Sequence, residues 1–412
     1  MTLHYPFPQI THIDQVRKAI FNRPEYIVVE KEGGYTVVNY VYSGEDTFPP
    51  VIDREVSQTD YLTGLRDATD AAILRECRGL IFCSETGVVI SRRFHKFFNA
   101  GERADVVPEA MIGAEYDVLE KLDGSMITPI PLKGGFWRWG TKMGVTDVAL
   151  PVEEFVLDNS QYVELADYCK QTDWTPIFEW CSPLNRIVLQ HTTHNLILTA
   201  IRHNVTGEYM SYARMSALAG RFDIPVVRRV NADILANYRE SEGVEGYVLR
   251  FANGHMMKFK TEWYVRLHKT KDKIAREVDV AQLVFDDQAD DLLPLLDEDD
   301  KARLIEYRAA FWRRFEDVKN GISLMLDQWR GEGDRRNFAI HTDPCASQPR
   351  RDLTYPSPWA RTIMFTAWDG KVPVDTAVRI AVSKGLVNNR KFAELKEGLL
   401  QGLRWKEAWE VE

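Results

Sequence analysis

The sequence predicts an α+β fold in which a domain built on antiparallel sheets is followed by an all-α domain. Two observations lead to this prediction. Before about residue 262, short apolar runs alternate with Gly-containing turns, which is typical of antiparallel strands. After Thr261 the apolar residues recur at helical spacing. We therefore expect one domain over residues 1–262 and a second over residues 263–412.

Strands are expected at regular places along the first domain. Segments 25–42 and 77–94 each carry two apolar runs split by a Gly-containing turn, so we expect two antiparallel hairpins. Further strand patterns lie within 116–130, 135–142, 176–180, 195–203 and 246–260. Helical patterns separate some of these strands, near 151–170, 211–221 and 231–240.

The second domain is predicted to be helical throughout, apart from one connection. Helical spacing recurs in residues 263–278, 301–330, 375–385 and 389–409. Residues 331–358 are rich in Gly, Pro and charge, and we expect a connecting loop there.

Composition excludes some classes of protein and leaves others open. The chain has 412 residues, 45% of them hydrophobic, and neither a signal-peptide core nor a stretch long enough to span a bilayer. We expect a soluble cytoplasmic monomer with no membrane partner. Five cysteines without paired spacing argue against a disulfide framework and a structural zinc site. The net charge of −9 is concentrated in residues 286–300, so a local basic groove remains compatible with it.

The sharpest chemical signal is K-L-D-G-S at residues 121–125, which follows the apolar run 116–119 at a predicted strand end. A lysine there can act as a nucleophile only when its amine is neutral. At the usual lysine pKa of about 10.4, roughly one amine in a thousand is neutral at pH 7, so the site would have to lower that pKa. Taken alone, the pentapeptide favours a solvated lysine before a turn over a nucleophile.

Three later motifs favour the nucleophile. In order they are F-E-W at 178–180, E-G-Y-V at 245–248 and K-F-K at 258–260, each on or next to a predicted strand. Together with K-x-D-G, this order resembles the covalent nucleotidyltransferases, which comprise DNA ligases, RNA ligases and mRNA capping enzymes. Each motif is weak singly, but four in the same order are specific.

Finer matches narrow the resemblance to the phage RNA ligase 1 family of single-strand RNA ligases. The matching blocks are E-C-R-G at 76–79, K-F-F-N at 96–99, P-L-N-R-I-V at 183–188 and K-T-E-W-Y at 260–264. The resemblance is closest over residues 75–270. Two departures argue against DNA ligases and capping enzymes: Met126 stands where their motif has arginine, and the chain turns helical where theirs continues into a β-rich domain.

The resemblance implies a role for each motif residue. Lys121 would be the nucleophile that forms a lysyl-AMP, and Glu179 would bind the ribose hydroxyls. Glu245 would hold the catalytic metal, Mg²⁺ or Mn²⁺, or its water shell, since carboxylate oxygen suits such ions. Lys258 and Lys260 alternate along a strand and share a face, so both can meet the α-phosphate. A solvent-facing strand would also explain these charges.

Four more residues are implied to contact the nucleotide. Arg78 and Lys96 would bind phosphates, with the leaving β- and γ-phosphates as the target of Lys96. Lys142 matches a further lysine near the phosphates. Tyr40 matches a nucleotide-contacting tyrosine, although its apolar surroundings in the sequence also fit a core position.

Two groups of residues have competing interpretations. Asp290 and Asp291 would bind a second metal according to the family match, or form a solvated acidic face on a helix. His191 and His194 are too weakly placed to be metal ligands, and we interpret them as structural.

The implied reaction consumes ATP in three transfers. Lys121 takes AMP and releases pyrophosphate, the AMP passes to a 5′-phosphate RNA end, and a 3′-hydroxyl displaces it. The partners would be single-stranded RNA ends presented by the helical domain, with a cleaved tRNA as one candidate, inside a phage-infected host cell. The alternatives are a DNA or broad polynucleotide ligase with the same lysine chemistry and an RNA-end-binding protein that has lost catalysis.

Overall fold

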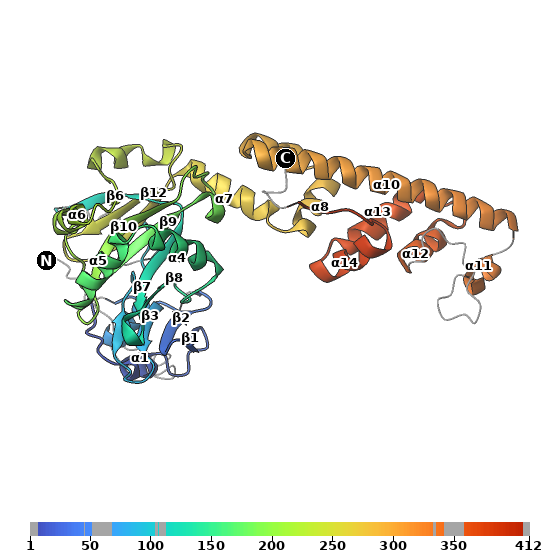
Figure 1. Cartoon of the computed structure of the whole chain (residues 1–412). Helices are drawn as coiled ribbons and strands as arrows, with labels where there is room; N and C mark the ends of the chain where they lie inside the picture. The colour runs from blue at the N-terminus through green and yellow to red at the C-terminus, as the bar shows by residue number, and fades with distance from the viewer. Residues whose placement is uncertain are drawn as a thin grey trace. The chain divides into compact units, whose positions relative to one another are not determined.

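The computed structural model of the chain divides into two compact units, Met1–Val265 and Arg266–Glu412 (Figure 1). It describes residues 7–44, 46–51, 68–103, 106, 113–332, 335–341 and 358–406. The division falls inside helix α7 (Glu262–Ile274), close to the boundary expected after residue 262.

The described part of the first unit contains three sheets, and nearly all of their strand pairs are antiparallel. The first sheet has the order β1-β2-β3-β4, from β1 (Tyr26–Lys31), β2 (Tyr35–Tyr40), β3 (Arg78–Cys83) and β4 (Val89–Ser91). The second has the order β10-β9-β7-β8, from β7 (Ser125–Pro131), β8 (Trp137–Gly140), β9 (Trp174–Cys181) and β10 (Asn195–His203). The third has the order β11-β6-β12-β13-β5, from β5 (Phe98–Asn99), β6 (Tyr116–Lys121), β11 (Arg229–Val230), β12 (Gly246–Phe251) and β13 (Met256–Lys260).

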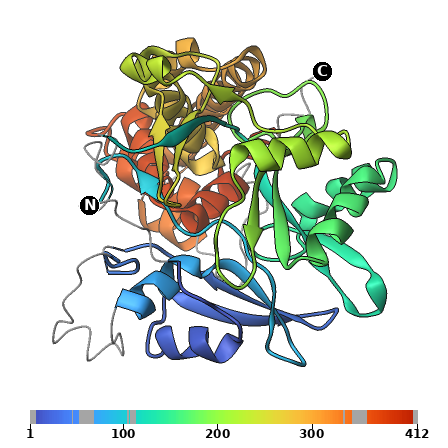
Figure 2. The ribbon, with the colours of Figure 1, turned by 90° about the vertical axis from the view of Figure 1, so that its left-hand side faces the viewer.

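Both predicted hairpins are confirmed, since β1 pairs antiparallel with β2 and β3 with β4. Alternation along these strands buries Val38, Leu80 and Phe82 in one core cluster with Ile13 and Val16 of helix α1 (Ile13–Ala19). Figure 2 shows this blue sheet with the short helix against it. Helix α1 is not predicted, because seven residues with three buried positions leave too little periodicity to recognise.

The second sheet is covered on one face by helices α4 (Leu150–Leu157), α5 (Gln161–Lys170) and α6 (Tyr212–Arg221). Their apolar side chains share a core cluster with Phe178, Trp180 and Leu198 of the sheet. The helical patterns near 151–170 and 211–221 are therefore confirmed. Residues 231–240 instead form two short 3₁₀ helices, Ala232–Ala236 and Tyr238–Glu240, in which no side chain is fully buried.

The described part of the second unit contains helices joined by short connections and no strand. After α7 come α8 (Glu277–Phe285), α9 (Ala289–Leu292), α10 (Glu298–Glu332), α11 (Arg335–His341), α12 (Pro358–Ala367), α13 (Val374–Gly385) and α14 (Asn389–Gly398). Its core gathers around Phe311 and Phe315 of the long helix α10 and Val378 and Val382 of α13. The predicted α+β class with an all-α second part is confirmed.

The loop predicted over 331–358 contains helix α11 and the first residue of α12. Within the described ranges, none of the helices has both the length and the apolar character needed to cross a membrane. Cys77, Cys83, Cys169 and Cys181 are free thiols, whereas Cys345 lies outside the described residues.

Candidate active site

Lys121 is the last residue of β6 and forms an ion pair with Glu245. Its Nζ lies 2.6 Å from Glu245 Oε2, and the Nζ of Lys260 lies 3.0 Å from Glu245 Oε1. The register explains this bridge. Gly246 pairs with Lys121 on one side and with Lys260 on the other, so the carboxylate just before β12 reaches both amines. The nucleophile expected from the sequence therefore lies beside the predicted metal residue.

Glycine is the only residue type that fits at position 246 of β12. Its φ is +151°, and a Cβ atom there would lie 2.0 Å from the carbonyl oxygen of Phe259. The E-G pair thus brings two backbones into close approach and leaves the preceding carboxylate between the two lysines.

Asp123 fixes the turn that follows Lys121. Its buried carboxylate accepts hydrogen bonds from the backbone N–H groups of Val188 (2.8 Å) and Leu189 (2.6 Å) and from the Tyr264 hydroxyl (2.6 Å). The ring of His191 is 2.7 Å from the Asp123 carbonyl oxygen. The P-L-N-R-I-V block and Tyr264 thus support the lysine turn, and His191 has the structural place expected of it.

Gly124 lets the turn approach the second sheet. A Cβ atom there would lie 2.4 Å from the Trp180 carbonyl oxygen. The next residues begin β7, which pairs Met126 with Glu179 of β9. The K-x-D-G motif therefore links β6 of the third sheet to β7 of the second.

A cavity of about 250 Å³ lies between these two sheets. Its walls combine apolar side chains with charged ones, and the charged members include Arg78, Lys121, Glu179, Arg250 and Lys258. Four of the residues expected to bind the nucleotide, Arg78, Lys121, Glu179 and Lys258, thus line one space. Met126, in the place of the arginine of related motifs, lines it too and receives a contact of 3.4 Å from Arg78 Nη1.

Glu179 has an unusual carboxyl group. Burial, reinforced by the negative charges of Glu245 and Asp123, raises its pKa to about 7 against the opposing effect of Lys121. Its ionisation therefore costs folding free energy, and this cost appears as the pH rises from about 4.5 to 7.

We expect Glu179→Gln to be relatively more stable at pH 8 than at pH 5, because the amide never ionises. The Tm of the variant minus the Tm of the wild type should be roughly 2–4 °C higher at pH 8 than at pH 5. This is the change that about 1 kcal/mol produces in a domain of this size. Thermal unfolding followed by circular dichroism measures it, with the exposed Glu154→Gln as the control. A constant difference across the range would contradict the assignment.

Lys258 is held among cations. Burial, together with Arg78, Lys121, Lys96 and Lys260, keeps the pKa of its ammonium well below the usual lysine range. Its Nζ lies 4.7 Å from the centre of the Phe97 ring. A site that crowds positive charge in this way is suited to several phosphate oxygens.

Lys258→Met should raise stability and lower the AMP transfer that the resemblance implies. The folded state disfavours the protonated lysine, so its removal should raise Tm by about 2–4 °C at pH 6, and less as the pH approaches 10.5. Transfer of AMP should fall by about 10²–10³-fold, the usual effect of losing one donor to a transition state. Lys170→Met, on an exposed helix face, is the control. Lower stability, or unchanged transfer, would contradict the role.

Tyr40 lies between two further lysines. The Nζ atoms of Lys96 and Lys142 are each 5.1 Å from the centre of its ring. Burial by itself would raise the pKa of the phenol, but Lys96, Arg78 and Lys142 outweigh burial and lower it. Lys96 also contacts the rings of two phenylalanines, Phe48 and Phe98. The structure thus brings the four predicted residues Tyr40, Arg78, Lys96 and Lys142 together.

Backbone contacts bring these cations to one place. Asn39, next to Tyr40, pairs with Arg78 of β3. Gly79, at φ +80°, lets the Lys142 backbone approach, because a Cβ atom there would lie 2.6 Å from the Lys142 carbonyl oxygen. The segment after Lys96 runs parallel to β13, with Asn99 opposite Lys258.

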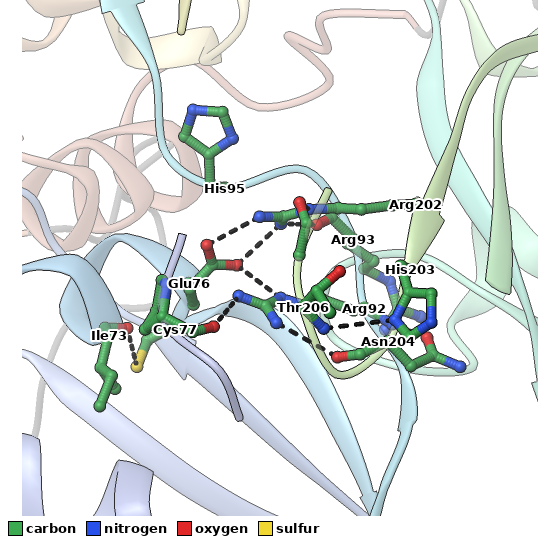
Figure 3. Close-up of polar contacts among 12 residues, drawn as sticks. Ile73, Glu76, Cys77, Arg92, Arg93, His95, Arg202, His203, Asn204 and Thr206 are labelled. Atoms are coloured by element: carbon green, nitrogen blue, oxygen red, sulfur yellow. Dashed lines mark hydrogen bonds and ion pairs between the residues drawn. The ribbon is translucent and has the colours of Figure 1, made fainter. Parts of the chain in front are cut away.

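A buried ionic network lies just before Arg78. Glu76 accepts hydrogen bonds from Arg202 Nη1 and Nη2 (2.7 Å each) and from Arg92 Nε (3.1 Å), and all three side chains are inaccessible to solvent. Figure 3 shows the two guanidinium groups converging on the carboxylate. Burial would raise the pKa of Glu76, but Arg202 and Arg92 lower it. The network ties the start of β3 to β10 and to the strand-end residues after β4.

Asp290 and Asp291 lie in the second unit, on the exposed side of the short helix α9. Asp290 Oδ1 forms an ion pair of 2.5 Å with Arg308. In the part of the chain that the structure describes, no three His, Cys, Asp or Glu side chains are grouped closely enough to hold a metal ion. A second metal at these residues therefore stays a prediction, and a solvated acidic face describes their surroundings.

Sequence reasoning missed several residues of the site. Thr199 and Arg250 line the cavity, and Glu76 supports its wall through Arg92 and Arg202. The alternation of side chains along a strand could have identified Arg250, because it lies four residues after Gly246 and therefore on the same face of β12. Residues such as Glu76 and Arg202, which pair inside the protein but lie far apart along the chain, leave no comparable pattern in the sequence.

Comparison with known proteins agrees with these motifs. The family model described as "RNA ligase", of the T4 ligase 1 type, matches residues 76–264. A protein named "Putative RNA ligase" from Thermovibrio ammonificans is 31% identical over 232 residues, which are 55% of this chain and 61% of that protein. RNA ligase 1 of bacteriophage TS2126 is 27% identical over 226 residues, 50% of this chain and 55% of its own. The chain thus spans about three-fifths or less of the length of these relatives.

A solved archaeal ATP-dependent RNA ligase shares 14% identity, covers 74% of this chain and 79% of its own, and superposes with a TM-score of 0.43. The matched region 76–264 contains both the lysine turn and the cavity-lining strands β6, β7, β9 and β12. On these sequence matches, residues 76–264 of the chain are similar to the RNA ligases of the T4 ligase 1 type.

Proposed function

We propose that this protein is an ATP-dependent RNA ligase that stores AMP on Lys121 and then joins 5′-phosphate and 3′-hydroxyl ends of single-stranded RNA. One observation carries the proposal. The Lys121 amine lines a cavity with both apolar and charged walls, on a turn held by Asp123 and close to Arg78 and Lys258. A fixed nucleophile beside clustered cations suits attack on a phosphate.

In the first transfer, Lys121 Nζ would attack the α-phosphorus of ATP. The P–N bond forms while the bond from the α-phosphorus to the bridging oxygen breaks, and pyrophosphate leaves. The amine must shed protons, and Glu245 Oε2 at 2.6 Å is placed to accept one. Arg78, Lys96, Lys142 and Lys258 would neutralise the phosphates and the leaving group.

A divalent cation fits the donors present. Glu245 would hold it, as the resemblance implies, and the negative charge of Glu245 already contributes to the raised pKa of Glu179, so a bound cation would relieve this repulsion. Mg²⁺ in such sites uses one or two carboxylates and completes its shell with water and substrate phosphates, which agrees with the lack of a larger acidic group among the described residues. When bound, the ion would stabilise charge on the transferring phosphoryl group.

Two later transfers would complete the reaction. A 5′-phosphate oxygen of RNA displaces Lys121 from the AMP phosphorus, and a 3′-hydroxyl then attacks the adenylated 5′-phosphate and releases AMP. Cleaved tRNA as the substrate, a monomeric state and a cytoplasmic location in an infected host stay predictions.

The test is label transfer from α-³²P-ATP with Mg²⁺ or Mn²⁺, on protein first stripped of bound AMP with pyrophosphate. We expect label on the protein and its passage to 5′-phosphate RNA, which is then sealed. Equal sealing of 5′-phosphate DNA ends would favour the polynucleotide ligase instead. RNA binding without any labelling would favour a binding protein that has lost catalysis.

A further inference from the structure

Arg250 presents a buried positive group at the end of the cavity remote from Lys121. The residue is 5% exposed, and among the described residues neither Nη1 nor Nη2 has a hydrogen-bond partner. Its charge is balanced by Asp117, whose Oδ2 lies 3.6 Å from Nη2. Buried guanidinium donors are normally satisfied, so the unmatched N–H groups point to an acceptor that a ligand brings.

The register of the third sheet gives the distance from the reacting end. Gly246 pairs with Lys121, and Arg250 pairs with Asp117 four residues away, roughly 13 Å along the strand at the usual rise per residue. Leu119, Val248 and Met256 line the same part of the cavity. An apolar end whose one guanidinium is already charge-balanced suits a flat, neutral ring with acceptor nitrogens better than a phosphate.

Thr199 faces this cavity from the second sheet. The register of β10 shifts between Leu198 and Ala200, which makes Thr199 the extra residue of a β-bulge. Bulges next to active sites re-aim a side chain. The Thr199 hydroxyl donates its proton to the Ile177 carbonyl oxygen at 2.9 Å, so toward the cavity its oxygen can only accept.

We propose that Arg250 and Thr199 recognise the base of the nucleotide, with Arg250 donating to a ring nitrogen and Thr199 accepting from an exocyclic amine. The inference rests on the proposed function and names its base specificity. Adenine offers a ring acceptor beside its N6 amine, whereas guanine presents O6 at that place. Arg250 alone could also donate a hydrogen bond to guanine. Thr199 can only accept a hydrogen bond toward the cavity, so it favours the amine of adenine over O6 of guanine and thereby selects ATP over GTP.

The experiment compares self-labelling by ATP with labelling by analogues that each lack one group. Triphosphates of 7-deazaadenosine and 1-deazaadenosine lack one ring acceptor each, and purine riboside triphosphate lacks the amine. For the wild type we expect about a 10- to 100-fold loss of labelling efficiency with one deaza analogue, the range for a hydrogen bond to a charged donor, and a similar loss without the amine.

Two variants assign the contacts. In Arg250→Met the discrimination between ATP and the deaza analogue should fall to near one, and in Thr199→Val the discrimination against the missing amine and against GTP should fall. Arg229→Met is the matched control, because Arg229 also pairs with Asp117 (3.1 Å) but is half-exposed. It should keep the wild-type ratios. A packing defect would reduce the amount of active protein and lower labelling by ATP and by each analogue equally. The ratio of the two labelling efficiencies would then stay unchanged.

Two outcomes separate this inference from the proposed function. A wild type labelled by ATP that uses all analogues equally, or variants that keep the wild-type ratios, overturns base recognition by these residues and leaves the ligase intact. A wild type that ATP does not label at all overturns the proposed function, and this inference with it. If Arg250→Met does not fold, the wild-type ratios and Thr199→Val still decide.

Discussion

Replacing Lys121 with alanine is expected to abolish labelling by α-³²P-ATP and sealing of 5′-phosphate RNA, by more than about 10⁴-fold, since the variant has no amine to carry the AMP. The structure predicts that the fold survives. Lys121 Nζ bonds to Glu245, and this carboxylate keeps Lys260 at 3.0 Å as its second partner. Denaturing gels after pyrophosphate stripping measure the label, and circular dichroism measures the fold.

A second substrate separates chemistry from folding. RNA that already carries a 5′-adenylate needs only the last transfer, in which the lysine takes no covalent part. Lys121→Ala should therefore still seal adenylated RNA while failing on 5′-phosphate RNA. Lys133→Ala, at an exposed position paired with Glu85, is the control and should behave as wild type. Label on the Lys121 variant would place the nucleophile elsewhere.

Glu76→Gln is expected to lower the free energy of unfolding by about 3–5 kcal/mol, the usual result of removing one partner from a buried ion pair. The amide leaves Arg92 and Arg202 with uncompensated charges, and both are inaccessible to solvent (Figure 3). Such a loss corresponds to a fall in Tm of roughly 6–20 °C. The matched control is Glu153→Gln, which breaks a partly exposed pair with Arg138 at 2.7 Å and should cost below about 1 kcal/mol.

The pH dependence of this effect has a definite sign. The pKa of Glu76 is lowered in the folded state, so its stabilising contribution is present above the unfolded value near 4.5 and is lost as the pH falls. Denaturant unfolding of wild type and variant at pH 7 and at the lowest pH where both fold should therefore show a narrowing gap. A cost at pH 7 as small as that of the Glu153 control would refute the role of the network.

The two confirmed hairpins show which features of the fold a local sequence pattern can predict. The hairpins at 25–42 and 77–94 are found because alternating apolar residues and glycine turns are local signals. The short helix α1 is not, because so few residues carry no clear period. The helical pattern near 231–240 forms only short 3₁₀ helices, in which no side chain is buried. Helix α11 lies in a stretch whose charge and glycine content suggested a loop.

The sequence by itself determined the α+β class, the change to helices after residue 262 and the lysine motif, since each depends on residue type and short spacing. It also named, through the resemblance, the residues expected to bind the nucleotide. Only the tertiary structure decided which charges meet. Glu245 bridges Lys121 and Lys260, Glu76 joins Arg92 and Arg202, and Arg250 ends the cavity, because strand register and buried pairing connect residues up to 126 positions apart. Such contacts are set by burial and close approach, whose free energies depend on neighbours that the linear order does not reveal.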